Sequence, residues 1–387
     1  MAITDKEKGV WGLDQVYNKI NQGSIWTYEG ELYSWGPGGS GQLAQNNQTQ
    51  YSSPVLVSGT AGWTKIFKNY GDTTTISGLK SDGTIWTWGS GGNGQLAQNN
   101  RTQYSSPIQI PGTTWVVIRN GNGFSGGLKT DGTLWTWGGN YYGQLGHNQP
   151  SNTLLSSPVQ IPGSWGTTID SLGSGSAGMT CIKADGTLWA WGYNGYGGLG
   201  QNNKTNYSSP RQVGSATDWS SVASFHSFHN GAIKTDGTLW IWGKFDATGQ
   251  NNATDYSSPI QVPGGDTTWS KISGATKRAF AIKTDGTLWS WGNNGAGGLG
   301  HNDTTNIQSP KQVPGTNWSD VVGRAYGHTL ASKTDGTLWS WGNNDNGQLG
   351  HNNTTQRSSP VQIPGTDWIG AGAISMAENG SFAINAG

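Results

Sequence analysis

Residues 285–292 read Asp-Gly-Thr-Leu-Trp-Ser-Trp-Gly, and close copies of this stretch recur along the 387-residue chain. Neighbouring copies are 49 to 54 residues apart. A near-constant period of this length indicates one supersecondary unit that is repeated in an array. There are seven copies, and their last tryptophans are Trp35, Trp88, Trp137, Trp191, Trp242, Trp291 and Trp341.

Each copy belongs to a unit with four short strand-like segments. In one unit, residues 269–272, 280–283 and 288–291 are short apolar segments. Asp285-Gly286 stands between the second and the third, and Asp-Gly is a strong signal for a tight β-hairpin. After a loop rich in Gly and Asn, Gln312-Val313 makes a short fourth segment. Four antiparallel strands without a helical period predict one blade of an all-β, seven-bladed propeller.

The two ends of the chain carry complementary parts of one blade. Residues 381–385 match the second strand of another unit, at 279–283, but no Asp-Gly hairpin follows them. The third and fourth strands of such a blade are found near the other end, at 32–35 and 54–57. We therefore expect both ends to share the seventh blade, which removes open sheet edges. The alternative is a hairpin between 24–27 and 32–35 that competes with the C-terminal strand.

The repeat accounts for all but two of the 22 tryptophans, Trp11 and Trp26. Six copies contain a Trp-x-Trp pair, and a further tryptophan, here called the opening tryptophan, starts each of the seven units. Alternate residues of a strand share a face, so both members of a pair point the same way. We expect these rings to form the core between blades. The alternative is a ring of exposed tryptophans that stacks on sugars.

Composition argues against several classes of function. Only 11% of residues are charged, and 22 Lys and Arg balance 22 Asp and Glu. A neutral chain without a basic run lacks the positive face that nucleic-acid binding requires. No apolar run has the length of a membrane helix, and the first six residues lack an apolar signal core. We expect a soluble protein that binds no nucleic acid and does not insert into a membrane.

No constellation of residues indicates catalysis, a cofactor or a metal. Cys181 is the single cysteine, at a strand position where other units carry Gly or Ala, which predicts a small buried residue. His147, His301 and His351 share one repeat position, so they lie a blade apart and are expected to be turn residues rather than joint metal ligands. We find no nucleophile–base pair, phosphate loop or carboxylate pair, and we expect that the protein is not an enzyme.

The segments after each Trp-Gly resemble the RCC1 family (regulator of chromosome condensation repeats). Residues 342–350 read Gly-Asn-Asn-Asp-Asn-Gly-Gln-Leu-Gly, and 360–363 read Pro-Val-Gln-Ile, close to that family's signature. The resemblance covers residues 29–387 and implies a seven-bladed RCC1-like β-propeller. It implies no single function, because the founding member exchanges nucleotide on a small GTPase and binds chromatin. Other members are interaction platforms or pieces of bacterial and phage proteins.

This chain departs from the founding member of that family. Its units are nearly identical to one another, whereas an exchange factor needs one individual face, and it has no basic arm for chromatin. The histidine that the family carries just before the second strand is present only as His328 and His229. We therefore transfer the fold and no catalytic residue. A cytosolic exchange factor or interaction adaptor stays an alternative function, and a carbohydrate-binding, lectin-like propeller is another.

Function on a repeated scaffold resides in positions that break the repeat. In the middle units, aromatic residues stand in the loops after the third strand, where adjacent blades present them on one rim. Exposed loop aromatics are typical of binding surfaces, although repacking around altered loops is the alternative. The candidate binding residues are Tyr141, Tyr142, Tyr193, Tyr196 and Phe245.

Residues 1–28 do not fit the repeat, so we divide the chain into this segment and a propeller at 29–387. The segment opens with Trp-x-Leu-x-x-Val-Tyr, which resembles the opening of phage virion proteins, especially tail or capsid appendages. A short helix is expected there, because the spacing of one apolar helical face is shown by Leu13, Val16, Tyr17 and Ile20.

The resemblance to virion proteins implies a non-catalytic, fibre-like appendage or decoration protein. Residues 1–28 would anchor it to other virion proteins, and the propeller would contact a host surface protein or a glycan. The neutral, Gly-, Asn- and Thr-rich composition is similar to that of phage fibre and decoration proteins. The alternatives are a segment that only caps the propeller and a cytoplasmic location.

Overall fold

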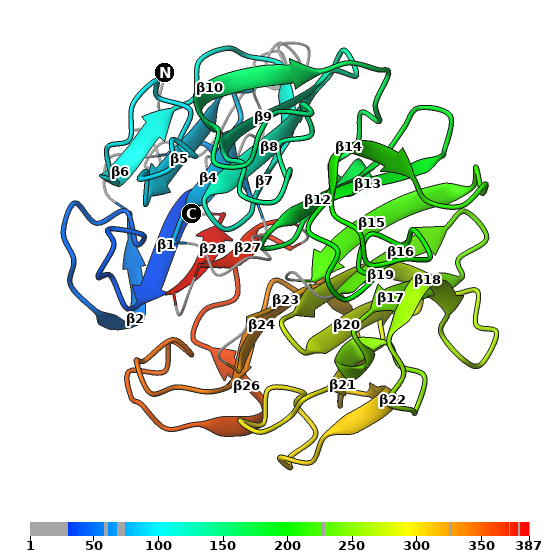
Figure 1. Ribbon diagram of the computed structural model, residues 1–387. Helices are drawn as coiled ribbons and strands as arrows, with labels where there is room; N and C mark the ends of the chain where they lie inside the picture. Colours follow the sequence, from blue (N-terminus) through cyan, green and yellow to red (C-terminus); the bar gives the residue numbers. More distant parts are fainter. Residues whose placement is uncertain are drawn as a thin grey trace, which may run out of the picture.

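The computed structural model describes residues 30–57, 61–67, 74–225, 229–324, 327–370, 372–377 and 380–386. Within these residues, the strands form seven antiparallel sheets of four strands each. The first strands of successive sheets contact one another, from β7 (Trp115–Asn120) round to β3 (Trp63–Ile66), and so surround the centre of a ring. Figure 1 looks onto this ring, with the fourth strands at its edge. The predicted all-β, seven-bladed propeller is confirmed.

We number the blades by their first strands, so that blade 1 is β3 to β6 and blade 7 combines β27, β28, β1 and β2. Blades 1 to 3 comprise β3, β4 (Ile76–Lys80), β5 (Ile85–Gly89), β6 (Tyr104–Gln109), β7, β8 (Phe124–Lys129), β9 (Leu134–Gly139), β10 (Leu154–Ile161), β11 (Leu172–Ser174), β12 (Gly178–Ile182), β13 (Leu188–Gly192) and β14 (Tyr207–Gln212). Blades 4 to 6 comprise β15 (Trp219–Phe225), β16 (His229–Lys234), β17 (Leu239–Gly243), β18 (Tyr256–Gln261), β19 (Trp269–Ala275), β20 (Arg278–Lys283), β21 (Leu288–Gly292), β22 (Ile307–Gln312), β23 (Trp318–Gly323), β24 (His328–Lys333), β25 (Leu338–Gly342) and β26 (Arg357–Ile363). Blade 7 comprises β27 (Ile374–Ala377), β28 (Gly380–Asn385), β1 (Glu31–Gly36) and β2 (Tyr51–Leu56). The described residues also form two short 3-10 helices, η1 (Ile169–Ser171) and η2 (Phe245–Ala247).

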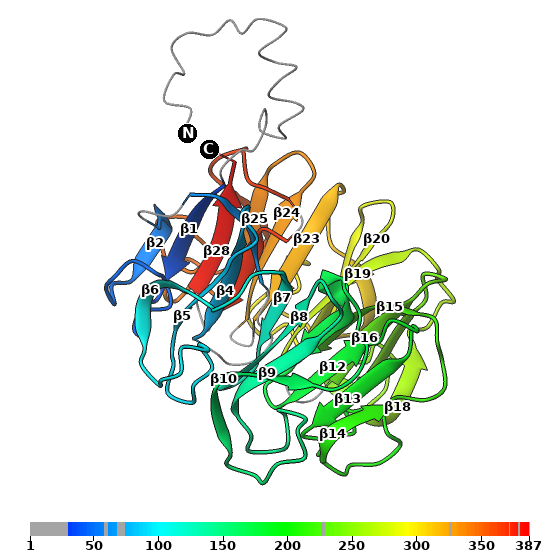
Figure 2. The ribbon, with the colours of Figure 1, turned by 90° about the horizontal axis from the view of Figure 1, so that it is seen from above.

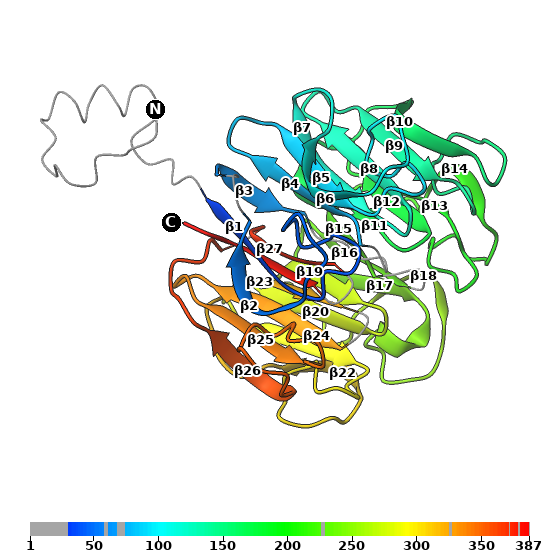
Figure 3. The ribbon, with the colours of Figure 1, turned by 90° about the vertical axis from the view of Figure 1, so that its left-hand side faces the viewer.

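Blade 7 is shared between the two ends of the chain. Its strand order is β2-β1-β28-β27, and the register pairs Leu32 with Ile384 and Tyr33 with Ala383. Figure 2 shows red β28 beside blue β1, and Figure 3 shows the red C-terminal strands next to β1 from another side. The predicted shared closure is confirmed, with β28 paired to β1. Residues 24–27, which were considered as a competing partner of β1, lie outside the described residues.

The fourth strands begin earlier than the sequence pattern predicts. β22 starts at Ile307 and β2 starts at Tyr51, whereas the predicted segments were 312–313 and 54–57. Both strands contain a Ser-Pro pair, which in β22 lies wholly among the added residues, and proline cannot donate a hydrogen bond to a ladder. These strands lie at the outer edge of their sheets, and the pairing register shifts beside the proline. Edge strands with such a bulge tolerate proline.

The second tryptophan of each Trp-x-Trp pair joins two blades. Trp291 is fully buried, and its Nε1 donates to the backbone oxygen of Ala247 in the preceding blade at 2.8 Å. We call this bond a tryptophan latch, because it buries a large ring and satisfies the single donor of that ring together. Equivalent latches, with bonds of 2.7 to 3.0 Å to the preceding blade, are formed by Trp35, Trp88, Trp137, Trp191, Trp242 and Trp341.

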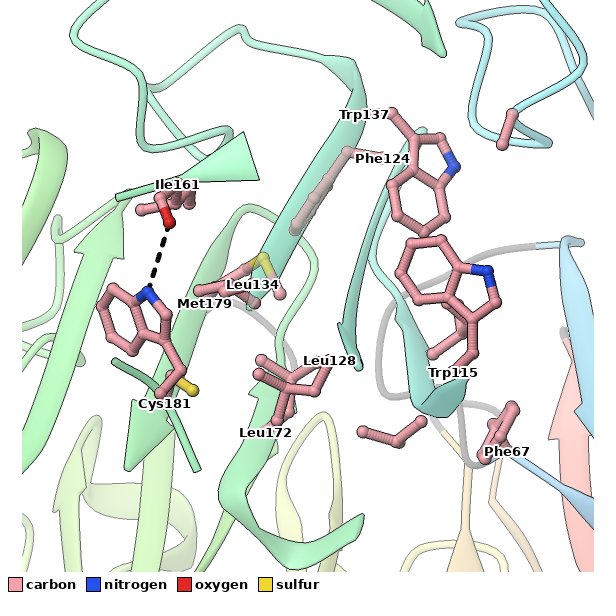
Figure 4. Packing of buried hydrophobic residues seen from close by; sticks show 14 of the residues in the cluster. Phe67, Trp115, Phe124, Leu128, Leu134, Trp137, Ile161, Leu172, Met179 and Cys181 are labelled. Atoms are coloured by element: carbon pink, nitrogen blue, oxygen red, sulfur yellow. Dashed lines mark hydrogen bonds between the residues drawn. The ribbon is translucent and has the colours of Figure 1, made fainter. Parts of the chain in front are cut away.

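The opening tryptophans are also buried, and they pack against the latches. In blade 2, the rings of Trp115 and Trp137 meet edge to face with their centroids 5.9 Å apart, beside Phe124 (Figure 4). Cys181 lies in the same hydrophobic cluster, fully buried, and burial raises the pKa of its thiol. The predictions of a tryptophan core between blades and of a small, buried, unreactive cysteine are therefore confirmed for these residues.

The first tryptophan of each pair is only half-buried, so the predicted core position holds for it in part. Trp289 lies under Lys283, whose Nζ is 4.2 Å from its ring centroid and 4.8 Å from that of the opening Trp269. A cation in this position is attracted to the ring face and shields it. Because the chain's own lysine covers the ring, the sugar-stacking alternative loses support. The same arrangement is made by Lys80, Lys129, Lys183, Lys234 and Lys333.

In the six copies with a Trp-x-Trp pair, Asp-Gly-Thr fixes the hairpin that carries the pair. Asp285 accepts hydrogen bonds from the backbone N and the Oγ1 of Thr287, at 2.9 and 2.7 Å, and Trp289 Nε1 donates to the same Oγ1 at 3.0 Å. Gly286 has φ +77°, which favours glycine at this turn position. The hydrogen bond from Thr287 lowers the pKa of Asp285. The aspartates therefore act in the turns, as predicted.

Candidate interaction surface

The loops after the third strands are held in shape from inside. In blade 2, the buried Asn140 accepts a hydrogen bond from the backbone N of Leu145 at 3.1 Å and donates to two backbone oxygens of the same loop. Asn194 accepts from the backbone N of Leu199 at 2.8 Å in blade 3. Because the buried asparagine satisfies the polar groups of the loop internally, each loop keeps a defined shape while its other side chains face outward.

Glycine brings these loops close to the next blade. Gly143 follows Tyr142 with φ +83°, and a Cβ atom at this position would lie 2.6 Å from the Cα of Ser208 in blade 3. Only a residue without a side chain permits this approach. The loop of blade 2 therefore leans on blade 3, which places Tyr142 beside the tyrosines of the next loop.

Three of the predicted site residues meet in a continuous contact across two blades. The rings of Tyr142 and Tyr193 pack edge to face with centroids 5.2 Å apart, and Tyr193 packs on Tyr196 in the same way at 6.5 Å. The neighbouring Tyr141 instead donates its hydroxyl to Asn93 Oδ1 of blade 1 at 2.9 Å. We call Tyr141, Tyr142, Tyr193 and Tyr196 the tyrosine ladder. The prediction that these loops bring aromatic residues together on one rim is confirmed for Tyr142, Tyr193 and Tyr196.

Solvent reaches the ladder along its length. Tyr141 and Tyr142 are 42% and 48% exposed, which is far above the value for the buried tryptophans, and Tyr193 and Tyr196 are half-buried. Partial burial, with the neighbouring Tyr196 and Tyr142, raises the pKa of Tyr193. The four tyrosines offer hydroxyl groups that both donate and accept hydrogen bonds.

The ladder continues into blade 4 through a cation. Lys244 Nζ lies 5.4 Å from the ring centroid of Tyr196, and it forms an ion pair with Asp246 at 3.5 Å. Phe245 stands between these two residues at the start of η2, so its backbone is at the predicted rim. The side chain of Phe245, and the predicted anchoring residues Leu13, Val16, Tyr17 and Ile20, lie outside what the structure describes.

Asn93 and Lys244 extend this surface, and the sequence analysis did not find them. Neither type of residue stands out among the many Asn and Lys of the repeat. Lys244 directly follows Gly243, as Tyr193 follows Gly192, whereas Asn93 stands four residues after Gly89, the position that Tyr142 has after Gly138. A comparison of these two loop positions around the ring would have identified both residues.

Two grooves lie between blades, away from the ladder. The larger, about 650 Å³, separates blades 2 and 3 and is lined by Thr153 of the long loop, Trp189 and Lys183. An equivalent groove of about 490 Å³ separates blades 6 and 7, where Tyr33 and Trp368 line it. These grooves repeat with the fold, so they are less individual than the ladder.

The loop histidines have a structural role. His147, His301 and His351 each contact the hydroxyl of a strand residue in their own blade, at 2.9 to 3.0 Å. Burial lowers the pKa of each imidazole. The prediction that they are separate loop residues is confirmed. Across the residues that the structure describes, no three His, Cys, Asp or Glu side chains cluster to hold a metal ion, and no helix there has the length and apolarity to cross a bilayer.

Comparison with known proteins identifies the repeat. The model of the regulator of chromosome condensation (RCC1) repeat matches residues 29–67, 82–128, 131–178, 185–232, 285–331 and 335–378, which is more than half of the chain. The unmatched stretch between 232 and 285 contains the shortened loop of blade 4.

Curated relatives match parts of the chain. It is 27% identical over 192 residues to the human E3 ubiquitin-protein ligase HERC2, which covers 48% of this chain and 4% of that protein. It is 28% identical over 183 residues to the ultraviolet-B receptor UVR8 of Arabidopsis thaliana, covering 46% and 41%. A zebrafish (Danio rerio) RCC2 homologue is 35% identical over 104 residues, covering 26% and 21%. The chain thus spans less than half the length of each of these relatives.

Solved structures share the complete ring. Prp20p of Saccharomyces cerevisiae superposes with a TM-score of 0.79 at 18% identity, covering 94% of this chain and 92% of that one. Human WBSCR16 superposes with a TM-score of 0.78 at 17% identity, covering 92% and 98%. These likenesses show the shared fold. The repeat model matches more than half of the chain, so the chain belongs to the RCC1-repeat family of β-propellers.

Proposed function

We propose that this propeller is a non-catalytic binding module that recognises a partner protein through the tyrosine ladder. The observation that carries the proposal is the continuous contact from Tyr142 through Tyr193 to Tyr196, at positions that break the repeat. Tyrosines supply large contact areas at low cost in side-chain entropy, and they are enriched at binding hot spots. Ring contacts hold them in place before a partner arrives, which lowers the ordering cost of binding.

The relatives favour an adaptor over a virion appendage. HERC2, UVR8 and the RCC2 homologue come from animals and a plant, and HERC2 is an E3 ubiquitin-protein ligase in which the matched region is a small part. None of these three supports the appendage that residues 1–28 suggest. A cytoplasmic interaction adaptor is therefore our first reading, and a virion appendage anchored by residues 1–28 is the second. Co-sedimentation of the chain with virus particles would reverse this order.

The Prp20 likeness raises nucleotide exchange as a competing activity. Prp20p has been characterised for its binding to Gsp1p and histones, but at 18% identity the likeness extends to the fold alone. The formal net charge of this chain is zero, so it has no overall charge to draw in a basic or an acidic partner. Faster nucleotide release from a small GTPase, at catalytic amounts of this protein, would overturn the non-catalytic part of the proposal.

The test is quantitative co-purification of bound proteins with two matched variants of the full chain. Tyr141→Ala/Tyr142→Ala/Tyr193→Ala removes most of the ladder. Asn343→Ala/Asp345→Ala/Asn346→Ala changes the equivalent loop positions of blade 6 and serves as the control. We expect the ladder variant to lose its principal partner by about tenfold or more, because truncated hot spots cost about 1.4 kcal/mol or more each. Equal recovery with both variants would contradict the proposal.

A further inference from the structure

A cavity of about 200 Å³ lies on the axis of the ring, and it belongs to neither the ladder nor the grooves. Every blade contributes to its lining, mostly from the first strand or the residues just before it. The charged residues in the lining are Lys65, Arg119, Asp170, Lys271 and Asp320. Seven strands that converge on one axis thus bring together charges that are far apart in sequence.

Residues that line this cavity depart from the repeat, and packing between the blades does not require these departures. Lys65, Lys271 and Asp320 each stand two residues after an opening tryptophan, where blade 2 has Val117 and blade 4 has Ser221. A conserved packing role would use one residue type around the ring. Individual charges at a repeated position are instead expected where the axis meets a ligand.

Arg119 is fixed in the cavity wall. It is 5% exposed, and its Nε and Nη2 donate to the backbone oxygens of Leu172 and Ile169 at 3.0 and 2.9 Å. A guanidinium has five N–H donors, so these two bonds hold it while others stay available to a ligand. The side chain is therefore oriented in advance, as a binding site requires.

Lys65 and Lys271 supply the other two positive charges in the lining of the cavity. The stem of Lys65 lies beside Gly372, where a Cβ would be in ordinary van der Waals contact with the Lys65 Cγ at 3.7 Å. Lys271 Nζ donates to the backbone oxygen of Ser319 and lines the same cavity. Both lysines are half-buried, which strengthens their interaction with an anion relative to open water.

The carboxylates cancel only part of this charge. Both oxygens of Asp320 accept backbone N–H groups, from Val321 and Gly372 at 2.9 Å each, which hold the carboxylate in place. Asp170 is exposed. Among the described residues of the lining, three cations face these two carboxylates. This excess of positive charge favours an anion.

We propose that the axial cavity binds a small oxyanion, a molecule with a carboxylate or phosphate group that Lys65, Arg119 and Lys271 hold. Charge-assisted bonds from arginine and lysine to such oxygens are the strong ones. A cavity of about 150 Å³ accepts benzene, so about 200 Å³ accommodates roughly eight non-hydrogen atoms. This site is independent of the tyrosine ladder, and either proposal stands if the other fails.

The test is titration calorimetry of the full chain with inorganic phosphate and, in a separate arm, malonate, a small dicarboxylate. We expect saturable binding of at least one of them at one site per chain, and the arm that binds distinguishes phosphate from carboxylate ligands. Lys65→Ala/Lys271→Ala should weaken that binding by about tenfold or more. Lys204→Ala/Lys311→Ala removes the same charge from exposed positions and should change it by less than about twofold.

A gain of affinity provides a check that misfolding cannot mimic. Asp170→Asn removes a negative charge from the cavity and should tighten binding by about twofold to fivefold at low salt. Circular dichroism in the near ultraviolet, which the buried tryptophans dominate, verifies the fold of each variant. The proposal is overturned by the absence of saturable heat in both arms, by equal weakening in the two lysine pairs, or by weaker binding in Asp170→Asn.

Discussion

The tryptophan latches and the tyrosine ladder both place aromatic rings against the loops that follow the third strands, but they hold those rings differently. Trp291 is fully buried, and its nitrogen is satisfied by the neighbouring blade. Tyr142 is 48% exposed, and its ring packs edge to face against the half-buried ring of Tyr193. The latch recurs in all seven blades, whereas the ladder occupies only two. Residues that recur in every blade therefore stabilise the ring, and residues that break the repeat are available for binding.

The largest effect is expected from opening the ring. Removal of residues 368–387 deletes β27 and β28, which leaves β1 without its inner partner and exposes the first strand of the neighbouring blades. We expect the loss of a single cooperative unfolding transition, because the edge strands lose their pairing. Differential scanning calorimetry measures this. A single sharp transition near that of the full chain would show that closure does not depend on the shared blade.

The next effect separates the two members of one tryptophan pair. Trp291→Ala should destabilise the protein by about 3–5 kcal/mol, since it opens a cavity and leaves the Ala247 oxygen without its donor. Trp289→Ala removes a half-buried ring and should cost about 1–2 kcal/mol. Denaturant unfolding gives both values. Equal losses would mean that the latch contributes no more than the lysine-covered ring.

A pH effect is expected from one individual residue of blade 6. His328 is fully buried, and burial, with Arg324 and Arg278 nearby, lowers its pKa to about 3. The unfolded chain has the ordinary histidine pKa of about 6.5, so it binds the proton first as pH falls. Stability should therefore be complete above about pH 6.5 and decline below it, by at most about 1.4 kcal/mol for each pH unit.

Two substitutions isolate this histidine. His328→Phe copies Phe124, which holds the equivalent position in blade 2, and should make the decline between about pH 6 and pH 4.5 shallower. His351→Gln copies Gln45 at a loop position of blade 7 and serves as the comparison, because His351 is only half-buried. Unfolding midpoints of both variants, measured across this pH range, show which of the two histidines contributes more to the decline. An unchanged slope in His328→Phe would assign the decline to other groups.

The smallest effect on stability is expected in the ladder. Tyr142→Ala removes one edge-to-face contact and an exposed side chain, so it should cost about 1 kcal/mol or less. Denaturant unfolding beside Trp291→Ala measures the contrast directly. A loss as large as that of the latch would make Tyr142 a packing residue and transfer the candidate surface elsewhere.

The sequence was most informative where one physical requirement recurs. The fifty-residue period, the Asp-Gly hairpins and the split blade follow from residues such as Gly286 and Ile384, whose partners lie at fixed offsets. The gathering of Tyr142 and Tyr193 was predictable for the same reason, since the loops that follow the third strands of adjacent blades share a rim. The different burial of the two tryptophans in a Trp-x-Trp pair could not be predicted. Strand alternation places both rings on the same face and does not determine how deeply each ring is buried.

The axial cavity could not be predicted from the sequence either, for a different reason. Lys65 and Lys271 share a repeat position, but Arg119 stands two residues further along than the Val117 that is their counterpart, and Asp170 belongs to the 3-10 turn η1. Their meeting depends on the three-dimensional convergence of seven strands with local irregularities. Periodicity predicts which residues are equivalent, and it does not predict which unequal residues become neighbours.

The central claim is that the individual rim of blades 2 and 3, and not the repeated frame, receives the partner. Hydrogen–deuterium exchange of the full chain, with and without the protein that co-purifies with it, tests this most directly. We predict slower exchange confined to peptides that cover residues 140–144 and 193–197, with no change at the equivalent 293–297 and 343–347. Protection at the blade 5 and blade 6 loops instead, with none at the ladder, would contradict the account.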